Sequence, residues 1–470
     1  MPNRLPGRLL TRACTLGSAV ALLGAALTGT ATATAGTATA TAGTTAAPAA
    51  GHRTGTLADG ATWIADVPAH WNGTLLLFSH GYGPTVAADA PSTASQQELL
   101  AEGYALAGSS YDPSGSWWAL DSAERDQFAT LDAFSRTVAR PARTLSVGES
   151  MGGLVNARIA RDGAGRVDGA VGFCGLVAGG VDLDDYQLQA EYTIAALLLP
   201  GQQVKLTGFS SAADAAATAD QLTAAVTAAQ ATAQGRARIA LAAAYLNLSD
   251  WAPGLNPPPA DDPAVQEAQQ YDWFTQGLLP FIENGRWSIE QSAGGNTSGT
   301  AGTDYARLLS SSEHGAEVAA LYRQAGLDLR SDTTALTRGA RVHADPSAVR
   351  RLEQTSTAGQ GLAVPLLDVH TISDQLVPVQ QEQAFAQRVR AAGDSALLRQ
   401  AYVDRQSHCN FTTAEFVASI HALDHRVSTG RWDGQTSAAA LQSAADRLGL
   451  DGAAFIAYRP GRLVGAQPNN

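Results

Sequence analysis

Charged residues are scarce in this chain of 470 residues, and acidic residues outnumber basic ones. Only 16% of the residues are charged, Lys205 is the only lysine, and the formal net charge is −12. An acidic chain repels phosphate backbones and anionic headgroups, which argues against nucleic acid or an anionic membrane as the partner. Apolar residues make up 45% of the chain, so the shortage of charge indicates a large core rather than disorder.

Cysteine is equally rare, with Cys14, Cys174 and Cys409 as the complete set. They form no Cys-x-x-Cys pair and no metal-binding spacing. A phosphate-binding loop, a dinucleotide fingerprint and a calcium loop are also missing. We therefore expect neither a metal nor a cofactor.

Residues 1–45 have the pattern of a signal peptide followed by a flexible leader. Arg4, Arg8 and Arg12 precede an apolar stretch at 16–27, which is too short to span a bilayer. Small-residue cleavage sites follow it. A membrane anchor is the alternative, but no stop-transfer cluster of charges follows the apolar stretch. The pattern predicts a secreted, extracellular protein without a stable membrane anchor.

The segment Gly148-Glu149-Ser150-Met151-Gly152 lies between an apolar run at 143–147 and a helical pattern at 154–160. Strand, Gly-x-Ser-x-Gly and helix in this order are the context of a nucleophile elbow. Small residues on both sides of the serine avoid a collision with the adjacent strand or helix. The Met151 amide, at a helix N-terminus, is placed to face a developing oxyanion. The motif predicts Ser150 as a nucleophile.

Strands and helices alternate in two parts of the chain. This alternation predicts an α/β fold with a mostly parallel central sheet covered on both faces. From 177 to 361 no core strand is evident, and Ala-rich helical stretches dominate. We predict a core over 46–176, a helical lid or cap insertion over 177–361, and the rest of the core with a C-terminal extension over 362–470. The strands are expected at 62–68, 74–79, 104–109, 143–147, 167–176, 362–370 and 397–403.

A serine hydroxyl is a weak nucleophile until a base removes its proton. His408 follows the strand at 397–403 and is the candidate base, while Asp374 follows the strand at 362–370 and is the candidate orienting acid. Asp368 and Asp404 are rivals, but they lie within or beside strands. The other histidines lack this position at a strand end, and His80 belongs to a loop discussed below.

The chain order Ser150, Asp374, His408 resembles that of the α/β-hydrolase fold, and the likeness covers roughly 60–176 and 362–430. The segment at 364–378 is similar to the family's His-Gly-x-x-Asp-x-x-Val-Pro loop, with a threonine in place of the glycine. His80-Gly81-Tyr82-Gly83 resembles the His-Gly loops of secreted bacterial esterases and lipases. The resemblance implies an oxyanion hole made by the amides of Tyr82 and Met151.

The sequence allows two alternative roles for each of two further pairs of residues. Trp117 and Trp118 either line an acyl or aromatic pocket as substrate-binding residues or anchor the lid. Cys174 and Cys409 either form a disulfide that holds the loop of His408 or remain buried thiols. An oxidising compartment favours the disulfide.

The sequence thus predicts a secreted serine hydrolase that cleaves carboxylic esters through an acyl-enzyme. Its expected partner is a small-molecule or polymeric ester, and no cofactor is expected. A secreted peptidase, aminopeptidase or amidase with the same triad is the first alternative. A non-catalytic binding protein on a hydrolase fold is the second.

Overall fold

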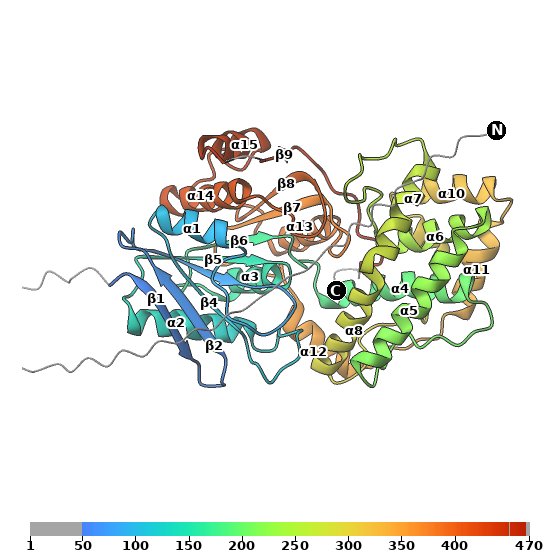
Figure 1. Ribbon diagram of the computed structural model, residues 1–470, viewed down its shortest axis with the longest axis horizontal. Coiled ribbons are helices and arrows are strands. Elements are labelled where there is room, and N and C mark those ends of the chain that lie inside the picture. The colour runs from blue at the N-terminus through green and yellow to red at the C-terminus, as the bar shows by residue number, and fades with distance from the viewer. Residues whose placement is uncertain (1–48, 451, 467–470) are drawn as a thin grey trace, which may run out of the picture. The chain divides into compact units, whose positions relative to one another are not determined.

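The structure is a computed structural model that describes residues 49–450 and 452–466. Within these residues nine strands form one sheet, in the spatial order β1-β2-β4-β3-β5-β6-β7-β8-β9 (Figure 1). Every strand predicted from the sequence is a member of it. The bounds are β1 Gly51–Thr56, β2 Thr62–Val67, β3 Thr74–Ser79, β4 Ala105–Ser109, β5 Arg143–Glu149, β6 Gly169–Phe173, β7 Leu366–Ser373, β8 Leu398–Gln406 and β9 Phe455–Ile456.

Strands β3 to β8 pair in parallel, whereas β1, β2 and β9 pair antiparallel at the two edges. β3, β4 and β6 are buried along their whole length, as expected for strands covered on both faces. Because the carboxyl ends of parallel strands lie at the same edge, the loops after these strands meet there. This is the mostly parallel sheet of the α/β-hydrolase fold, as predicted.

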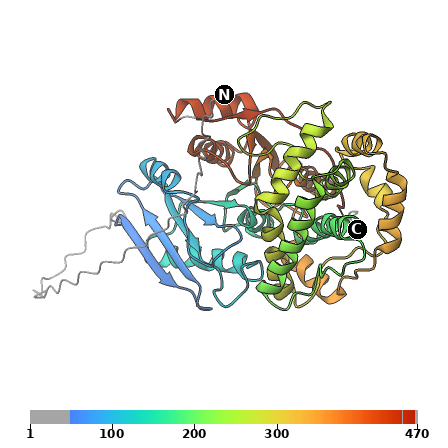
Figure 2. The ribbon, with the colours of Figure 1, turned by 45° about the vertical axis from the view of Figure 1, so that its right-hand side comes forward.

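Helices cover both faces of the sheet (Figures 1 and 2). Leu76 and Phe78 of β3 pack in the cluster that contains α1, α14 and α15. Leu75 and Leu77 point the other way and pack against α2. The helices around the sheet are α1 Thr93–Ala101, α2 Ala123–Thr137, α3 Met151–Asp162, α13 Gln381–Ala392, α14 Thr413–Thr429 and α15 Ala438–Arg447.

Between β6 and β7 the described chain contains helices and no strand, and we call this segment the cap. One hydrophobic cluster runs from α3 and α13 into α4, α5 and α8 of the cap. Residues 48–470 form one compact unit, and the predicted domain boundaries remain a prediction. The cap helices are α4 Gly180–Leu198, α5 Ala212–Ala229, α6 Ala233–Leu246, α7 Pro263–Trp273, a π-helical turn Phe274–Leu278, α8 Leu279–Ala293, α9 Tyr305–Leu309, α10 Gly315–Gln324, α11 Leu329–Gly339 and α12 Pro346–Ser356.

Several elements differ from the sequence-based expectation. The Ala-rich segment at 211–248 contains two helices, because the Thr232 side chain accepts a hydrogen bond from the Gly235 amide and caps α6. The strand β1 was not predicted. The strand expected from 362 begins at Leu366, because the amides of Ala363 and Val364 donate instead to the Ala160 carbonyl in α3.

The predicted signal peptide lies outside the described residues. Among the helices that the structure does describe, none combines the length and the hydropathy that a bilayer-spanning segment requires.

The turn from β5 into α3 brings two glycines against backbone atoms. A Cβ at Gly148 would lie 2.1 Å from the Gly152 carbonyl oxygen, and one at Gly152 would lie 1.9 Å from the Ser79 carbonyl oxygen. A side-chain rotation cannot relieve either contact. Ser150 has a φ of 59°, in the left-handed region that non-glycine residues rarely adopt. The close packing and the positive φ that an elbow motif requires are therefore both present at this turn.

The predicted disulfide is also present. Cys174 directly follows β6 and Cys409 follows β8, and their Cα atoms are 5.4 Å apart. These strands flank β7, and 235 residues separate the two cysteines. The bond therefore joins the first part of the sheet to the second across the whole cap segment.

Gly152→Ala should lower the free energy of unfolding by about 1–3 kcal/mol or more, because its Cβ would overlap backbone atoms. Urea unfolding followed by circular dichroism measures the change. Gly285→Ala in α8 is the matched control, since no heavy atom lies within 4 Å of its added Cβ. The control should be neutral or stabilising by up to about 1 kcal/mol. Equal stabilities of the two variants would contradict the steric argument.

Replacing both Cys174 and Cys409 by alanine should lower the free energy of unfolding by about 2–4 kcal/mol, because the bond restricts the unfolded chain. Thermal unfolding with and without a phosphine reductant provides the control. The reductant should lower the Tm of the wild type and leave that of the double variant unchanged. A double variant as stable as the wild type would refute a stabilising role.

Candidate active site

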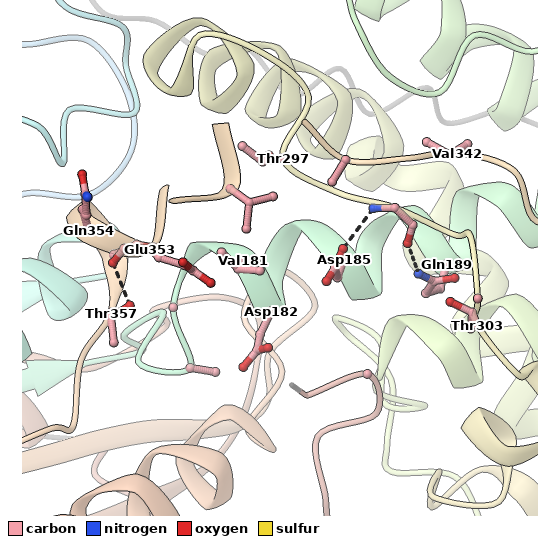
Figure 3. A pocket seen from close by; sticks show the side chains of 18 of the residues that line it. Val181, Asp182, Asp185, Gln189, Thr297, Thr303, Val342, Glu353, Gln354 and Thr357 are labelled. Carbon is pink, nitrogen blue, oxygen red and sulfur yellow. Dashed lines mark hydrogen bonds between the residues drawn. The ribbon is translucent and has the colours of Figure 1, made fainter. Parts of the chain in front are cut away.

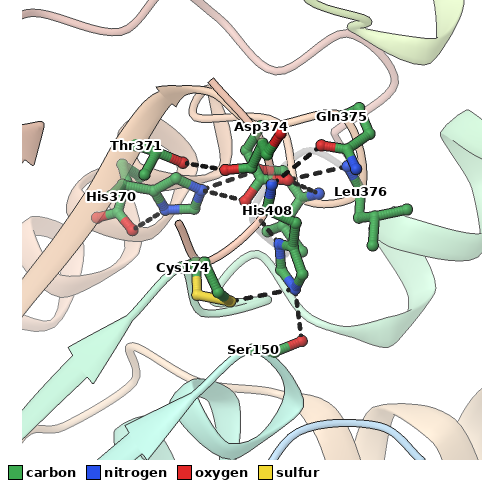
Figure 4. The surroundings of a disulfide bond; sticks show 12 residues. Ser150, Cys174, His370, Thr371, Asp374, Gln375, Leu376 and His408 are labelled. Atoms are coloured by element: carbon green, nitrogen blue, oxygen red, sulfur yellow. Dashed lines mark hydrogen bonds and ion pairs between the residues drawn. A yellow bond between two sulfur atoms is a disulfide. The ribbon is translucent and has the colours of Figure 1, made fainter. Parts of the chain in front are cut away.

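Three side chains from three strand ends form a continuous chain of hydrogen bonds (Figure 4). Ser150 follows β5, Asp374 follows β7, and His408 lies just beyond β8. His408 Nε2 is 2.8 Å from Ser150 Oγ, and His408 Nδ1 is 2.6 Å from Asp374 Oδ2. A carboxylate only accepts hydrogen bonds, so Nδ1 carries the proton and Nε2 is free to accept from the serine. The structure thus brings together the three residues chosen from the sequence.

Asp374 is 1% exposed, and both of its carboxylate oxygens are hydrogen-bonded. Oδ1 accepts from the amides of Leu376, at 2.9 Å, and Val377, at 2.8 Å, while Oδ2 faces His408. Burial alone would raise the pKa of Asp374, but the neighbouring His408 and His370 outweigh it and hold the pKa well below its usual range. The carboxylate is therefore ionised at neutral pH.

The rival residues do not take part in this chain of hydrogen bonds. Asp368 is buried within β7, and Asp404 is exposed in β8. His80 stacks on Tyr111 at a centroid distance of 4.1 Å and contacts the Gly81 carbonyl through Nδ1, at 2.8 Å. Burial lowers the pKa of His80, so its ring is neutral and serves the loop structure.

The loop of His408 is held from several sides. The His408 amide donates to Gln375 Oε1 at 3.0 Å, and the Ser407 amide donates to the Ser373 carbonyl at 2.8 Å. Cys409 Sγ lies 3.3 Å from His408 Nε2. Cys174, His408 and Cys409 are the one group in the described chain with atoms close enough for a metal, but the disulfide removes both thiolates as ligands.

The predicted oxyanion loop follows β3 and lies against Ser150. A Cβ added at Gly81 would be 3.0 Å from the Ser150 Cβ, so the backbone before Tyr82 passes directly beside the serine. Met151 is the first residue of α3, where amides have no partner within the helix. The proposed roles of the Tyr82 and Met151 amides remain predictions.

The Tyr82 side chain connects this loop to the cap. Its hydroxyl lies 2.9 Å from Ser288 Oγ and donates to the Asn284 carbonyl at 3.2 Å, both in α8. Its ring makes edge-to-face contacts with Trp117, at 5.9 Å, and with Phe281 of the cap, at 5.6 Å. We call Tyr82, Trp117 and Phe281 the aromatic cluster.

The two predicted substrate-binding tryptophans have different environments. Trp117 is 48% exposed, and Phe281 beside it in the aromatic cluster is 42% exposed. Trp118 is only 3% exposed and packs in the core near the start of α4, where a Cβ at Gly180 would touch its ring. Of the two alternatives, the packing favours the anchoring role for Trp118, and Trp117 remains available to a ligand.

Glu149 was not singled out from the sequence, although it precedes the nucleophile. Burial raises its pKa to about 7, and the nearby His408 opposes the rise. Its charge therefore changes near neutral pH, one residue from Ser150. Its place inside the motif was visible in the sequence, but its burial was not.

Several cavities lie at the junction of cap and core. One of about 910 Å³ runs along α4 (Figure 3), where Asp185 and Gln189 hydrogen-bond the backbone of Gly299. A smaller one of about 310 Å³ reaches Asp374 between Ser249 and Trp251. Ser150 lines neither of these two cavities.

Solved structures with similar folds include esterases and peptidases. The Pyrococcus furiosus esterase is 11% identical, with 81% of this chain and 90% of that chain covered and a TM-score of 0.37. Feruloyl esterase B from Aspergillus oryzae is 13% identical, with 80% of each chain covered and a TM-score of 0.37. The Pyrococcus horikoshii acylaminoacyl peptidase is 11% identical with a TM-score of 0.35, and 77% of this chain spans only 38% of that one.

No protein-family model matches the chain. A much closer similarity is to the o-phthalyl amidase of Xanthobacter agilis, which is 30% identical over 405 residues. The match covers 80% of this chain and 87% of the amidase. Similarity of this extent, together with the sheet order described above, means that the chain belongs to the family of that amidase and is a hydrolase of the α/β-hydrolase type.

Proposed function

We propose that the protein is a serine hydrolase with Ser150 as nucleophile, His408 as general base and Asp374 as the acid that orients it. The unbroken chain of hydrogen bonds from Ser150 Oγ through His408 to Asp374 carries this proposal. The strained backbone of Ser150 supports it, because such strain is typical of a nucleophile elbow.

The proposed reaction has two halves. His408 Nε2 takes the proton of Ser150 as the oxygen attacks the substrate carbonyl, and Asp374 stabilises the resulting imidazolium. The amides of Met151 and Tyr82 stabilise the oxyanion. His408 then gives the proton to the departing alcohol or amine, which leaves an acyl-enzyme. A water molecule, deprotonated by His408, hydrolyses that ester and restores Ser150.

We further propose that the bond cleaved is an amide of an aromatic carboxylic acid. The sequence alone favoured esters, but the relative that matches most of this chain is an o-phthalyl amidase. Both bonds pass through the same tetrahedral intermediate, and an amide additionally requires protonation of the leaving nitrogen. Because His408 supplies that proton, esters of the same acids are expected to be substrates as well.

The aromatic cluster is the proposed platform for the acyl group. Tyr82 belongs to the loop that passes beside Ser150. The rings of Trp117 and Phe281 each form a T-shaped contact with the Tyr82 ring. Both outer rings are exposed, although large aromatic side chains normally gain free energy by burial. An aromatic acyl group placed against them would cover this surface.

We also propose that the protein is exported and acts on its substrate outside the cell. The signal-peptide pattern at 1–45 and the disulfide between Cys174 and Cys409 support export, because such bonds persist in oxidising compartments.

Ser150→Ala should lower kcat/KM by about 10³-fold or more on both a phthalyl aryl amide and the matched aryl ester, because the acyl-enzyme cannot form. Initial rates of the purified mature protein provide the measurement. Ser146→Ala is the matched control, since this buried hydroxyl of β5 has no hydrogen-bond partner. It should retain wild-type rates.

The same substrate set separates the alternatives. If the protein hydrolysed the ester but not the amide, the result would support the esterase predicted from the sequence. A preference for aminoacyl amides over phthalyl amides would favour the peptidase alternative. Equal rates for the wild type and Ser150→Ala would indicate a non-catalytic protein.

Trp117→Ala and Phe281→Ala should each lower kcat/KM for the phthalyl amide by about 2–10-fold, because each removes one aromatic contact. The amide of the saturated cyclohexane dicarboxylic acid should lose less. Val265→Ala, another exposed apolar side chain of the cap, is the control. Equal losses for the aromatic and saturated substrates would exclude an aromatic acyl platform.

A further inference from the structure

His370 is a fully buried histidine in β7 that contacts the same carboxylate as His408. Its Nε2 is 3.6 Å from Asp374 Oδ2 and 2.8 Å from the Val377 carbonyl oxygen. Its Nδ1 is 3.1 Å from Glu382 Oε1 in α13. In Figure 4 the rings of His370 and His408 are both directed at Asp374. Asp374 thus lies between two imidazole rings.

Hydrogen-bond accounting indicates the charge of His370. A neutral imidazole donates from one nitrogen and accepts at the other. Both nitrogens of His370 face oxygens, and the Val377 carbonyl can only accept. Glu382 also accepts at its other oxygen, from the Gln400 side chain. A carboxylate at Glu382 can only accept, and with that partner both ring nitrogens donate, which corresponds to an imidazolium.

The charged and titratable groups around this ring agree with that assignment. Burial would lower the pKa of His370, but the Asp374 and Glu382 carboxylates outweigh it and raise the pKa to about 10. Burial and Glu382 raise the pKa of Asp368 on β7 well above its usual value. Burial, Glu382 and Asp368 also raise the pKa of Tyr402, which pairs with His370 across β7 and β8. Asp368 and Tyr402 are therefore neutral, which leaves Asp374 and Glu382 as the two acidic groups that face the His370 ring.

We propose that His370 is a permanently charged positioning residue of the active site, which holds Asp374 from one side while His408 uses the other. The inference rests on the proposed function, because it acts through the proposed catalytic acid. A fixed cation stabilises the buried carboxylate and makes protonation of the nearby His408 less favourable. Loss of the charge at His370 should therefore make protonation of the proposed general base more favourable.

The charge of His370 is directly measurable by NMR with ¹⁵N-labelled imidazole rings. We would use Ser150→Ala, so that the result does not depend on activity. Both nitrogens of His370 should carry protons from pH 6 to pH 9. Glu382→Gln in the same background removes one carboxylate and should let the ring lose a proton at lower pH. A singly protonated ring at pH 7 in the Ser150→Ala protein would overturn the proposal.

His370→Gln tests the consequence for catalysis, because glutamine keeps a hydrogen-bond donor and removes the charge. The acid limb of its pH profile of kcat/KM should move up by about one pH unit. Activity on that limb should therefore fall about tenfold more than activity at the plateau. His421→Gln is the matched control, since His421 of α14 pairs with Glu102, the residue after α1, and not with the residues of the site. Its profile should not move.

The remaining outcomes distinguish the proposed role of His370 from a purely structural role and from a failure of the proposed function. A uniform loss of activity with an unmoved acid limb would mean that His370 has a structural role, and the proposal would fail. If His370→Gln does not fold, the NMR result on the Ser150→Ala protein decides. Equal turnover by the wild type and Ser150→Ala would instead refute the proposed function, while the NMR measurement would still report the charge of His370.

Discussion

Burying the carboxylate of Asp374 costs free energy that only nearby donors and cations can offset. Two amides of its own loop, His408 and His370 supply them. The loop after β7 must therefore turn so that Leu376 and Val377 point their amides back at the side chain. The loop after β8 must bring a histidine to the remaining side. The fold around the site can be understood as the set of supports for this one charge.

The cap is connected to both catalytic loops rather than resting on them. The Tyr82 hydroxyl, in the predicted oxyanion loop, forms a hydrogen bond with α8. The hydroxyl of Ser373, the last residue of β7, lies 2.7 Å from Ser249 Oγ and donates to the Trp251 carbonyl at 2.6 Å. A displacement of the cap would therefore disturb the residues before Asp374 and beside Ser150 together. The cap thus supports the positions of residues that adjoin the proposed reacting groups.

The core and the site were predictable because steric rules and topology determine them. The Gly-x-Ser-x-Gly spacing is explained by sterics. A Cβ added at either glycine would lie 2.1 or 1.9 Å from a backbone oxygen, and no side-chain rotation can relieve that overlap. The loops of Asp374 and His408 follow parallel strands, so they meet at one edge. The helices of the cap were less predictable. Alanine-rich segments show weak periodicity, and residues that cap a helix N-terminus, such as Thr232, interrupt them. The contacts of His370 depend on α13, whose packing the sequence does not reveal.

Two groups next to His408 act on its charge in opposite directions. The proposed His370 imidazolium opposes protonation of His408 at every working pH, because its charge does not change there. Glu149 has a pKa raised to about 7 by burial, so it gains a negative charge as the pH rises and then favours the imidazolium. A base must be neutral before attack and charged afterwards, and catalysis is best when the two states are nearly balanced at the working pH. A fixed cation on one side and an acid that ionises near neutral pH on the other would therefore act on this balance in opposite directions.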